Sequence, residues 1–458
     1  MISAIQGLTI VPVLDEGLGN QSYVVGLGDR RALVIDPSRA PLPYLQIAER
    51  LGLKIVFAVE THLHADFVSG SRELAAQGAT ILAPRHARLE TAHQGLEDAD
   101  EVDLGGGLQL RVLATPGHTP EHLAYLLVND GAPLALFSGG ALIPGGAART
   151  DLIAPEQTEP LARSLYRSVR QQLAELPDEL SVYPTHGGGS FCSRGAGAER
   201  ITTLGRERQG NPLLMAPDED SFVREFLGGF GSYPSYFRRL RAVNQHGARL
   251  FGPVLPDLPR LSVDHVQRRL GDGAALIDTR RFREFAAAHI PGTLAIALRP
   301  AFASWLGWIL SDDRQLMFVV GEQQDRRDLV GQCLKIGYEN LLGELDGGMP
   351  AWRQADLPVA SVRLRQVDDD LGPTPLDVRQ DSEWEAGHLP KAQHIELGSV
   401  KAAQPGIRSG PLTIYCGHGD RAMTAASLLE AAGRRDLAVL DGGFEAWSQA
   451  GRPVTMDS

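Results

Sequence analysis

The second half of the chain repeats three short motifs, and this repeat restricts the fold more than any other feature. The motif D-x-R begins at Asp278 and again at Asp377, and H-[IL]-P begins at His289 and again at His388. The longer run L-D-G-G-x-x-A-W begins at Leu345 and again at Leu440. The spacing of about one hundred residues is a typical domain size, so residues 260–360 and 361–458 are predicted to form two similar domains. Strand-like and helix-like segments alternate in both, which predicts two small α/β domains.

The first half follows a different pattern and is expected to hold one larger domain. The chain has 458 residues, more than one hydrophobic core usually supports. Strand-like runs open this half in an antiparallel order and then alternate with helices, which predicts helices covering a sheet. Residues 249–259 contain prolines at positions 253, 256 and 259 and are predicted to be a linker. Residues 1–248 are therefore expected to be the first domain of an α/β multidomain protein.

Charge and hydropathy exclude several classes of partner. The net charge is −12 and no run of Lys or Arg is present, which argues against nucleic acid or an anionic membrane. Apolar runs are too short for a membrane span and the N-terminus lacks a basic leader segment, so a cytoplasmic protein acting on small molecules is expected. The composition is compatible with an oligomer. The three cysteines lie far apart and are expected to be thiols.

The run Thr61-His-Leu-His-Ala-Asp-Phe67 places two imidazoles and a carboxylate within five residues. It follows residues 54–59, an apolar and β-branched run that is predicted to be a buried strand. If the backbone stays extended, His62, His64 and Asp66 point to one side. Imidazole and carboxylate together suit zinc, iron or manganese. The sequence therefore predicts a metal site at the end of this strand.

Three later motifs extend this pattern. They are A-T-P-G-H-T-P with His118, A-R-T-D from Ala148, and Y-P-T-H-G with His186. In this order, the four motifs resemble the metallo-β-lactamase fold, an αββα sandwich, and within it the persulfide dioxygenase branch. That resemblance implies an Fe(II) site held by His62, by His118 and by an aspartate in a Ser/Thr-Gly-Asp stretch, acting on a persulfide of a glutathione-like thiol.

Two positions depart from the family pattern. Phe67 stands where the superfamily has a further metal-binding histidine, and Gly140 stands where the branch has its iron-binding aspartate. The expected site is therefore His62, His64 and His118, with Asp66 and His186 as weaker candidates. Three neutral imidazoles suit Zn(II) at least as well as Fe(II), and a site without the carboxylate is expected to bind its metal weakly or to lack it.

The repeated domains resemble the rhodanese family over nearly their whole length. In the second, Cys416-Gly417-His418-Gly419-Asp420-Arg421 lies between a predicted strand and a predicted helix. Such a loop aims backbone N–H groups and a helix dipole at one sulfur, which would hold a persulfide anion, and Arg421 adds a positive charge. A cysteine phosphatase has one residue more between Cys and Arg. The shorter loop favours sulfur chemistry, with Cys416 as the nucleophile.

The remaining cysteines have weaker signals. The first repeated domain has no cysteine in the corresponding loop, residues 318–326, so no sulfurtransferase activity is expected there. Cys333 lies in a predicted helix and is expected to pack in the core. Cys192 follows a glycine-rich run and is a candidate second thiol that accepts sulfur, with an ordinary loop thiol as the alternative.

These features together predict a sulfur-handling protein. Its C-terminal domain would transfer sulfur among thiols, thiosulfate or sulfite, and its first domain would be a persulfide dioxygenase with a partly degenerate metal site. Two alternatives remain open. In one alternative, the first domain is a zinc-dependent thiolester or lactam hydrolase, and Phe67 argues against this interpretation. In the other, it is a non-catalytic scaffold for one working rhodanese, and Gly140 favours this interpretation.

Overall fold

The computed structural model describes residues 3–5, 8–195, 197 and 199–456. The chain forms two compact units. One unit contains residues 1–256 and 333–337, and the other contains residues 257–332 and 338–458. Within the described part of the chain, no helix combines the length and apolar composition that a membrane crossing requires.

The first unit is built on two sheets. The first sheet has the strand order β1 to β7: β1 Ser3–Ile5, β2 Leu8–Asp15, β3 Asn20–Gly26, β4 Arg31–Ile35, β5 Lys54–Val59, β6 Thr80–Pro84 and β7 Gln94–Leu96. The second has the order β15-β13-β11-β10-β9-β8: β15 Thr202–Thr203, β13 Ser181–Pro184, β11 Ala132–Gly139, β10 Leu123–Asn129, β9 Leu108–Ala114 and β8 Glu101–Gly105. A small pair joins β12 Ala147–Ala148 to β14 Ser193–Arg194. Strands β2, β3 and β4 pair antiparallel, as the sequence predicts.

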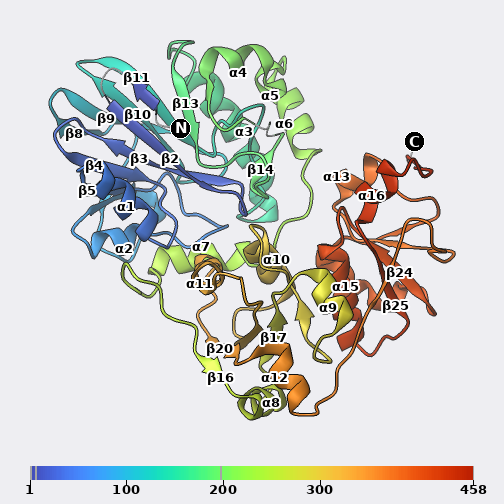
Figure 1. The fold of residues 1–458 in the computed structure, drawn as a ribbon. Helices are drawn as coiled ribbons and strands as arrows, with labels where there is room; N and C mark the ends of the chain where they lie inside the picture. The colour runs from blue at the N-terminus through green and yellow to red at the C-terminus, as the bar shows by residue number, and fades with distance from the viewer. Residues whose placement is uncertain (1–2, 6–7, 196, 198, 457–458) are drawn as a thin grey trace. The chain divides into compact units, whose positions relative to one another are not determined.

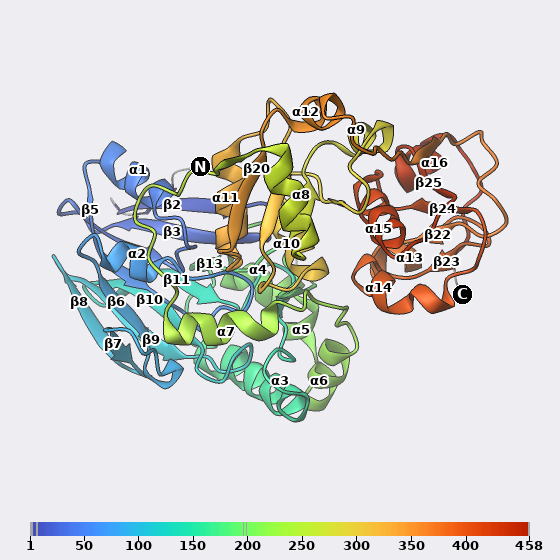
Figure 2. The same cartoon turned by 90° about the horizontal axis from the view of Figure 1, so that it is seen from below.

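Alternating apolar side chains produce the layers, because successive residues of a strand face opposite sides. In β3, Tyr23 and Val25 face the second sheet, while Val24 faces α1 Leu42–Arg50 and α2 Ser71–Ala75. In β10, Tyr125 faces the first sheet and Leu126 faces the outer helices. Those helices are α3 Thr158–Arg167, α4 Leu204–Gly210, α5 Pro212–Met215 and α6 Glu219–Leu227. Figures 1 and 2 show α1 and α2 outside one sheet and α3 to α6 outside the other, which is the predicted αββα sandwich.

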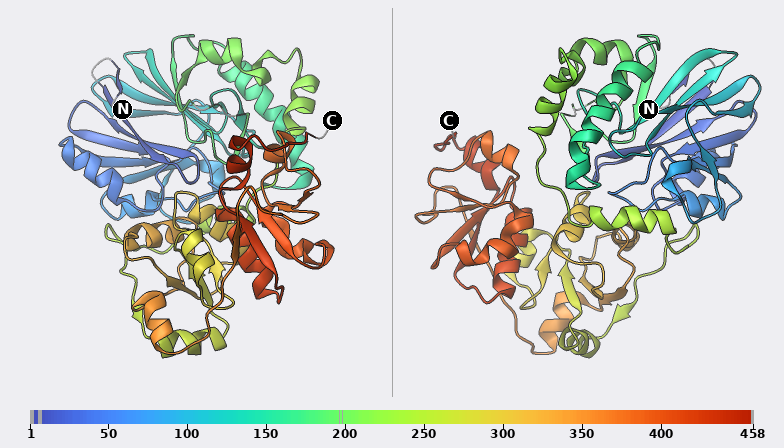
Figure 3. Two further views of the ribbon diagram at one scale, coloured as in Figure 1. Left: turned by 45° about the vertical axis from the view of Figure 1, so that its right-hand side comes forward. Right: turned by 180° about the vertical axis from the view of Figure 1, so that it is seen from behind.

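The second unit contains two sheets of parallel strands, and the strand order is the same in both. The first is β16-β20-β19-β17-β18: β16 Arg260–Leu261, β20 Leu341–Leu345, β19 Leu316–Val319, β17 Ala275–Asp278 and β18 Leu294–Ala295. The second is β21-β25-β24-β22-β23: β21 Arg363–Arg365, β25 Leu437–Leu440, β24 Leu412–Tyr415, β22 Leu376–Asp377 and β23 Gln393–His394. The matching order confirms the predicted repeat. The two sheets belong to the yellow-to-orange and orange-to-red parts of the chain in Figure 3.

Helices connect the parallel strands of both sheets, as parallel pairing requires. In the first repeat they are α8 Val263–Gly271, α9 Phe282–Ala287, α10 Phe302–Ile309, α11 Arg326–Lys335 and α12 Gly348–Gln354. In the second they are α13 Asp381–Glu385, α14 Val400–Ala403, α15 Asp420–Ala431 and α16 Gly443–Gln449. Both repeats are therefore small α/β domains, as predicted.

The repeated motifs have structural roles that explain why they recur. In each D-x-R motif the arginine bonds the aspartate, Arg280 to Asp278 at 2.5 Å and Arg379 to Asp377 at 2.6 Å. Each tryptophan of the third motif donates from its indole N–H to a proline carbonyl, at 3.0 Å in the first repeat and 2.8 Å in the second. The paired glycines start α12 and α16 with φ between 55° and 75°, a region that favours glycine.

Candidate functional site

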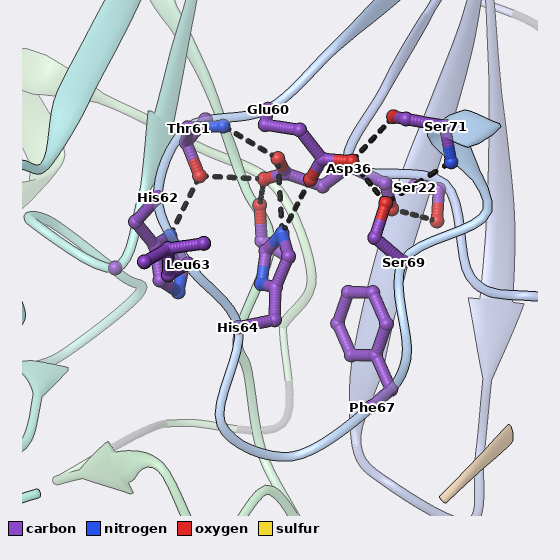
Figure 4. A network of polar contacts seen from close by, with 12 residues as sticks. Ser22, Asp36, Glu60, Thr61, His62, Leu63, His64, Phe67, Ser69 and Ser71 are labelled. Carbon is purple, nitrogen blue, oxygen red and sulfur yellow. Dashed lines mark hydrogen bonds and ion pairs between the residues drawn. The ribbon is translucent and has the colours of Figure 1, made fainter. Parts of the chain in front are cut away.

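The predicted metal motif lies in a buried loop at the end of β5. Thr61 donates to Asp36 from its backbone N–H and its hydroxyl, both at 2.7 Å. Tyr125 donates to the Glu60 carbonyl at 2.8 Å. These bonds hold the start of the loop, so that His62 and His64 follow in fixed positions (Figure 4).

Three histidines direct ring nitrogens at one point, and their hydrogen bonds define the tautomer of each. His118 Nδ1 lies 2.6 Å from the Arg149 carbonyl and must donate to it. His186 Nδ1 donates to Asn20 Oδ1 at 3.0 Å, because the Asn20 amide nitrogen is committed to Asp66. His62 Nδ1 donates to the Thr61 hydroxyl at 2.8 Å, because that hydroxyl gives its proton to Asp36.

The opposite nitrogen, Nε2, is therefore unprotonated in all three rings. His62 Nε2 and His186 Nε2 lie 3.4 Å apart. One nitrogen from each of His62, His118 and His186 lies within 4.8 Å of the others. Three converging lone pairs with no proton between them fit a cation, and each ring has the outer hydrogen bond typical of a metal-bound histidine.

Burial keeps these imidazoles neutral, the form that binds metal. Burial, and then the neighbouring histidine His186, lower the pKa of His118 to about 3. Burial, and then His64, lower the pKa of His186 to about 3. The pKa of His62 is also well below its usual value, chiefly because of burial and then His64.

His64 is positioned differently from the other three rings. Its Nε2 lies 3.2 Å from Asp36 and 3.1 Å from Glu60, and Phe67 stacks on its ring with centroids 4.2 Å apart (Figure 4). Burial alone would lower the pKa of His64, but the carboxylates of Asp36 and then Glu60 outweigh it and raise that pKa to about 10. The predicted ligand His64 is thus bound on one side to two carboxylates.

A second set of donors overlaps the first. His64 Nδ1 and Asp66 Oδ1 are buried and have no hydrogen-bond partner within the described residues. One ligand atom from each of His64, Asp66 and His186 lies within 4.8 Å of the other two. His186 and Asp66, ranked as weaker candidates from sequence, thus both lie at the cluster, and His186 belongs to both sets.

His122 is a buried histidine of the cluster that sequence analysis missed. It lies four residues after His118 in P-G-H-T-P-E-H, a spacing that would have marked it as a candidate. Its Nδ1–H donates to Thr115 at 2.8 Å, and its Nε2 accepts from the Gly140 N–H at 2.9 Å. Both nitrogens are occupied, so His122 holds the backbone at Gly140 and offers no lone pair to a metal.

The backbone at Gly140 has little space for a side chain. A methyl group on Gly140 would lie 2.8 Å from His118 Cδ2 and 2.8 Å from the Ala148 methyl group. An aspartate at this position would therefore reach the cluster only if the His118 ring or residue 148 moved. Gly140 and Ala148 together form a site closed to the carboxylate that the family places there.

Helix α7, Phe237–His246, packs on the loop of residues 61–67, called the metal loop below, and forms hydrogen bonds with it. Asn244 donates to the carbonyls of His64 at 2.8 Å and Phe67 at 2.9 Å, and accepts from the Ser69 N–H at 2.8 Å. Arg241 makes two bonds of 2.8 Å to Glu121, which also accepts from the Leu63 N–H. The loop that carries His62 and His64 is thus fixed to a helix about 180 residues away in sequence.

A small, partly open pocket adjoins this loop. Glu60, His62 and His64 line it, and the opposite wall is largely apolar, with Ile81, Ala83, Pro84, Ala87 and Leu89.

Cys192 lies beside the metal cluster but is protected from solvent. Its side chain is fully buried, and burial, followed by the nearby Asp66 carboxylate, raises the pKa of the thiol well above its usual value. A neutral thiol is a poor nucleophile. The structure therefore places this candidate second thiol near the cluster while keeping it unreactive in this conformation.

Cys416 lies between β24 and α15, as predicted. Its Sγ accepts a hydrogen bond of 3.1 Å from the Gly419 N–H. Its carbonyl accepts from the Phe444 N–H at 2.7 Å, and Gly443 packs so closely on the loop that a side chain there would collide with the Cys416 carbonyl. Arg421 makes two bonds to Glu383, at 2.5 and 2.7 Å, which hold its charge beside the loop. His418 is exposed and pairs with Glu445 at 2.6 Å.

The corresponding loop of the first repeat is filled by a side chain. Gln324 Oε1 accepts from the Gly321 N–H at 2.8 Å and from the Thr279 hydroxyl at 2.8 Å. Its amide nitrogen donates to the Thr279 carbonyl at 2.6 Å. The amide of Gln324 therefore uses a loop N–H group that would otherwise face a sulfur. Cys333 is buried in α11, in agreement with a packing role.

Known proteins match both halves of the chain. Residues 15–186 match the metallo-beta-lactamase superfamily, and residues 262–355 and 363–450 each match the rhodanese-like domain. The mitochondrial persulfide dioxygenase ETHE1 of Homo sapiens is 33% identical over 205 residues, which are 43% of this chain and 73% of that protein. The hydroxyacylglutathione hydrolase of Rhodopseudomonas palustris (strain HaA2) is 32% identical over 236 residues, 46% of this chain and 87% of that protein.

One solved structure spans both halves. The crystal structure of a metallo-beta-lactamase from Staphylococcus aureus subsp. aureus COL superposes with a TM-score of 0.64 at 28% identity, covering 75% of this chain and 99% of that chain. The fold, the motif order and these similarities agree. The chain belongs to the metallo-β-lactamase superfamily, in a form that joins a persulfide dioxygenase-like domain to two rhodanese-like domains.

Proposed function

We propose that this chain is a sulfur-handling enzyme whose C-terminal domain transfers sulfane sulfur through Cys416. The observation that carries the proposal is the hydrogen bond from the Gly419 N–H to Cys416 Sγ, in a loop that opens directly into helix α15. A backbone N–H and a helix N-terminus favour a sulfur anion over a neutral thiol. The first repeat supports this assignment by contrast, because its loop has a glutamine amide and no cysteine.

The transfer needs no external oxidant or reductant. The Cys416 thiolate attacks the sulfane sulfur of thiosulfate, the S–S bond of thiosulfate breaks, and sulfite leaves with the bonding electron pair. Cys416 then carries a persulfide, whose outer sulfur is attacked by a thiol or by cyanide. The thiolate of Cys416 leaves and is regenerated. Arg421, held by Glu383, places a fixed positive charge beside these anionic species.

Replacement of Cys416 tests the assignment. Cys416→Ser is expected to abolish thiosulfate:cyanide sulfur transfer while leaving the far-ultraviolet circular dichroism spectrum unchanged. Cys333→Ser is the matched control, because Cys333 is also a buried thiol and lies in helix α11, outside the loop. Activity retained by Cys416→Ser would move the nucleophile to another thiol and end this proposal.

For the first domain, we propose a metal site with His62, His118 and His186 as ligands, and with low-molecular-weight persulfides or other glutathione-type compounds as substrates. A bound Zn(II) or Fe(II) would supply Lewis-acid chemistry there, and Fe(II) would add oxygen chemistry. Arg149, Asn20 and Thr61 hold the three ligands in the tautomer that binds metal. The missing carboxylate at Gly140 leaves three neutral donors, which favours zinc over iron.

A hydrolase is the second candidate function for this domain. The observation in its favour is the set of three neutral imidazoles, together with the 32% identity to a hydroxyacylglutathione hydrolase. Metal analysis of protein purified without oxygen distinguishes the proposals. Iron supports persulfide oxidation, zinc supports hydrolysis of a thiolester, and the absence of bound metal supports a scaffold role for the first domain.

A further inference from the structure

The first repeat, which has no cysteine in its corresponding loop, touches the Cys416 loop at three consecutive residues. The Phe282 ring packs against Gly419, and a methyl group on Gly419 would lie 2.8 Å from it. Arg299 lies 3.7 Å from the Asp420 carboxylate. The Arg421 guanidinium lies over the Trp305 ring, 5.9 Å from its centroid. One half of the loop around the sulfur is therefore bordered by the domain whose own loop lacks a cysteine.

Hydrogen bonds between α15 and β18 fix the two domains to each other at this border. Thr424 of α15 donates to the Ala295 carbonyl at 2.6 Å, and the Ala295 N–H donates to Ser427 at 3.0 Å. Helix α15 thereby satisfies the open edge of β18, the last strand of the first repeat's sheet. Buried His289 also lies 2.8 Å from Glu430 at the other end of α15. The helix that follows Cys416 is thus built into the neighbouring domain.

Phe282 covers the peptide that stabilises the sulfur. Gly419 has φ of 126°, so its conformation and the ring above it both require glycine. The same residue supplies the N–H that donates to Cys416 Sγ. With the ring removed, this peptide gains freedom, and a directed hydrogen bond to a thiolate weakens when its donor moves.

Arg299 offsets the negative charge of Asp420 in the Cys416 loop. Asp420 is a partly exposed residue of the Cys416 loop, and an unpaired carboxylate there would repel an anionic sulfur donor. The other charged groups around the loop are already paired, Arg421 with Glu383 and His418 with Glu445. Arg299 is the cation from the neighbouring domain that neutralises Asp420.

We propose that the first rhodanese-like domain, whose own loop has no cysteine, completes the Cys416 site. Phe282 is a positioning residue that fixes the Gly419 N–H on the sulfur, and Arg299 determines specificity by admitting anionic sulfur donors such as thiosulfate. This inference rests on the proposed role of Cys416. It assigns the first rhodanese-like domain a function in the transfer reaction beyond that of a spacer.

The first test measures how alkylation of Cys416 by iodoacetamide depends on pH in the full chain, with the modified residue identified by mass spectrometry. Phe282→Ala is expected to raise the midpoint by about one pH unit, the scale of one hydrogen bond to a charged group. Phe282→Leu, which keeps a large apolar side chain, should bring the midpoint most of the way back to the wild-type value. Trp308→Ala is the matched control, because the Trp308 ring packs on Gly398, outside the loop. An equal midpoint in Phe282→Ala and Trp308→Ala would overturn the positioning role.

The second test uses steady-state kinetics with thiosulfate. Arg299→Ala is expected to raise KM roughly two- to fivefold with kcat unchanged, as for a partly exposed ion pair, and the difference should shrink in high salt. Arg299→Lys should keep the wild-type KM. Arg283→Ala is the control, because Arg283 pairs with Asp441 at 2.8 Å, outside residues 416–421. An unchanged KM in Arg299→Ala would overturn the specificity role, whereas activity in Cys416→Ser would instead contradict the proposed function.

Discussion

At the scale of single residues, the Nδ1 hydrogen bonds of three histidines decide what the first domain can bind. Thr61, Arg149 and Asn20 each accept a hydrogen bond from one histidine Nδ1–H, which leaves the lone pairs of the three Nε2 atoms pointing at one another. Without a cation, those lone pairs repel. A hydrogen-bonded core would have alternated donors and acceptors, as His122 does between Thr115 and Gly140. In His122 both ring nitrogens are used in hydrogen bonds, whereas each of the other three rings keeps one nitrogen that could bind a cation.

Gly140 gives the first prediction at this scale. Gly140→Asp would add the family's carboxylate, but its Cβ would lie 2.8 Å from the Ala148 methyl group. Gly140→Asp alone is therefore expected to destabilise the protein, by about 1–3 kcal/mol for an overpacked site. Gly140→Asp combined with Ala148→Gly should recover part of this loss and bind more iron. We expect little persulfide-dependent oxygen uptake in the unmodified protein and more in the double variant.

The measurement is anaerobic iron loading followed by an oxygen-electrode assay with glutathione persulfide. Ala148→Gly alone is the control for the loss of the methyl group. Vigorous oxygen uptake by the unmodified protein would show that the histidine cluster suffices without a carboxylate, and the expectation drawn from Gly140 would be wrong.

Sequence reasoning reached part of this site and missed the rest for identifiable reasons. His62 and His118 followed from their motifs, because each motif places a histidine at the end of a strand. His186 was predicted only as a weaker candidate. Its tautomer is fixed by Asn20, a residue 166 positions away, and sequence alone does not reveal that pairing. The same holds for His64, whose Nε2 is occupied by Asp36 and Glu60. Alternation in the loop predicted a shared side but gave no information on which nitrogen faces the centre.

At the scale of elements, helix α7 and the metal loop act as one structural part. Glu121 connects them, because it accepts from the Leu63 N–H and binds Arg241. Burial alone would raise the pKa of Glu121, but its bonds to Arg241 outweigh this effect and the pKa of Glu121 is lowered. A lowered carboxyl pKa contributes stability above the unfolded value of about 4.3, and this contribution is lost as the pH falls through the folded pKa.

The resulting prediction compares wild type with Glu121→Gln in urea unfolding monitored by far-ultraviolet circular dichroism. At pH 7 the variant is expected to lose about 1–3 kcal/mol, because Arg241 loses its charged partner. Below pH 4.5 the wild type should lose stability more steeply than the variant, so that the two curves converge. Glu101→Gln is the control, since Glu101 pairs with Arg111 on the surface. Parallel curves down to pH 3 would contradict the assigned role of Glu121.

The elements of the second unit were more accessible from sequence than those of the first. A repeated motif constrains two domains at once, and the left-handed glycines of L-D-G-G mark the start of a helix in both. The contacts of Phe282 and Arg299 with the loop could not be predicted. They depend on how β18 packs against α15, and no sequence motif in either segment predicts that contact.

At the scale of the whole molecule, the two candidate chemistries lie in different compact units. The histidine cluster belongs to the unit of residues 1–256, and the Cys416 loop belongs to the unit of residues 257–332 and 338–458. Among the described residues, none of the loop 416–421 belongs to a cluster of side chains that could hold a metal ion. Because thiosulfate transfer at Cys416 needs only a thiolate, N–H donors and Arg421, it should not depend on metal.

Metal removal tests this independence in the full chain. Prolonged dialysis against a strong chelator is expected to remove any bound metal and to lower the thermal stability of the first unit, since a ligand bound only to the folded state stabilises it. Thiosulfate:cyanide transfer should stay within about twofold of the untreated protein, a difference of less than 0.5 kcal/mol in activation free energy. His62→Ala should give the same result without chelator. A large loss of transfer activity in both experiments would mean that the metal cluster controls the Cys416 site, and the two chemistries would then have to be treated as one coupled reaction.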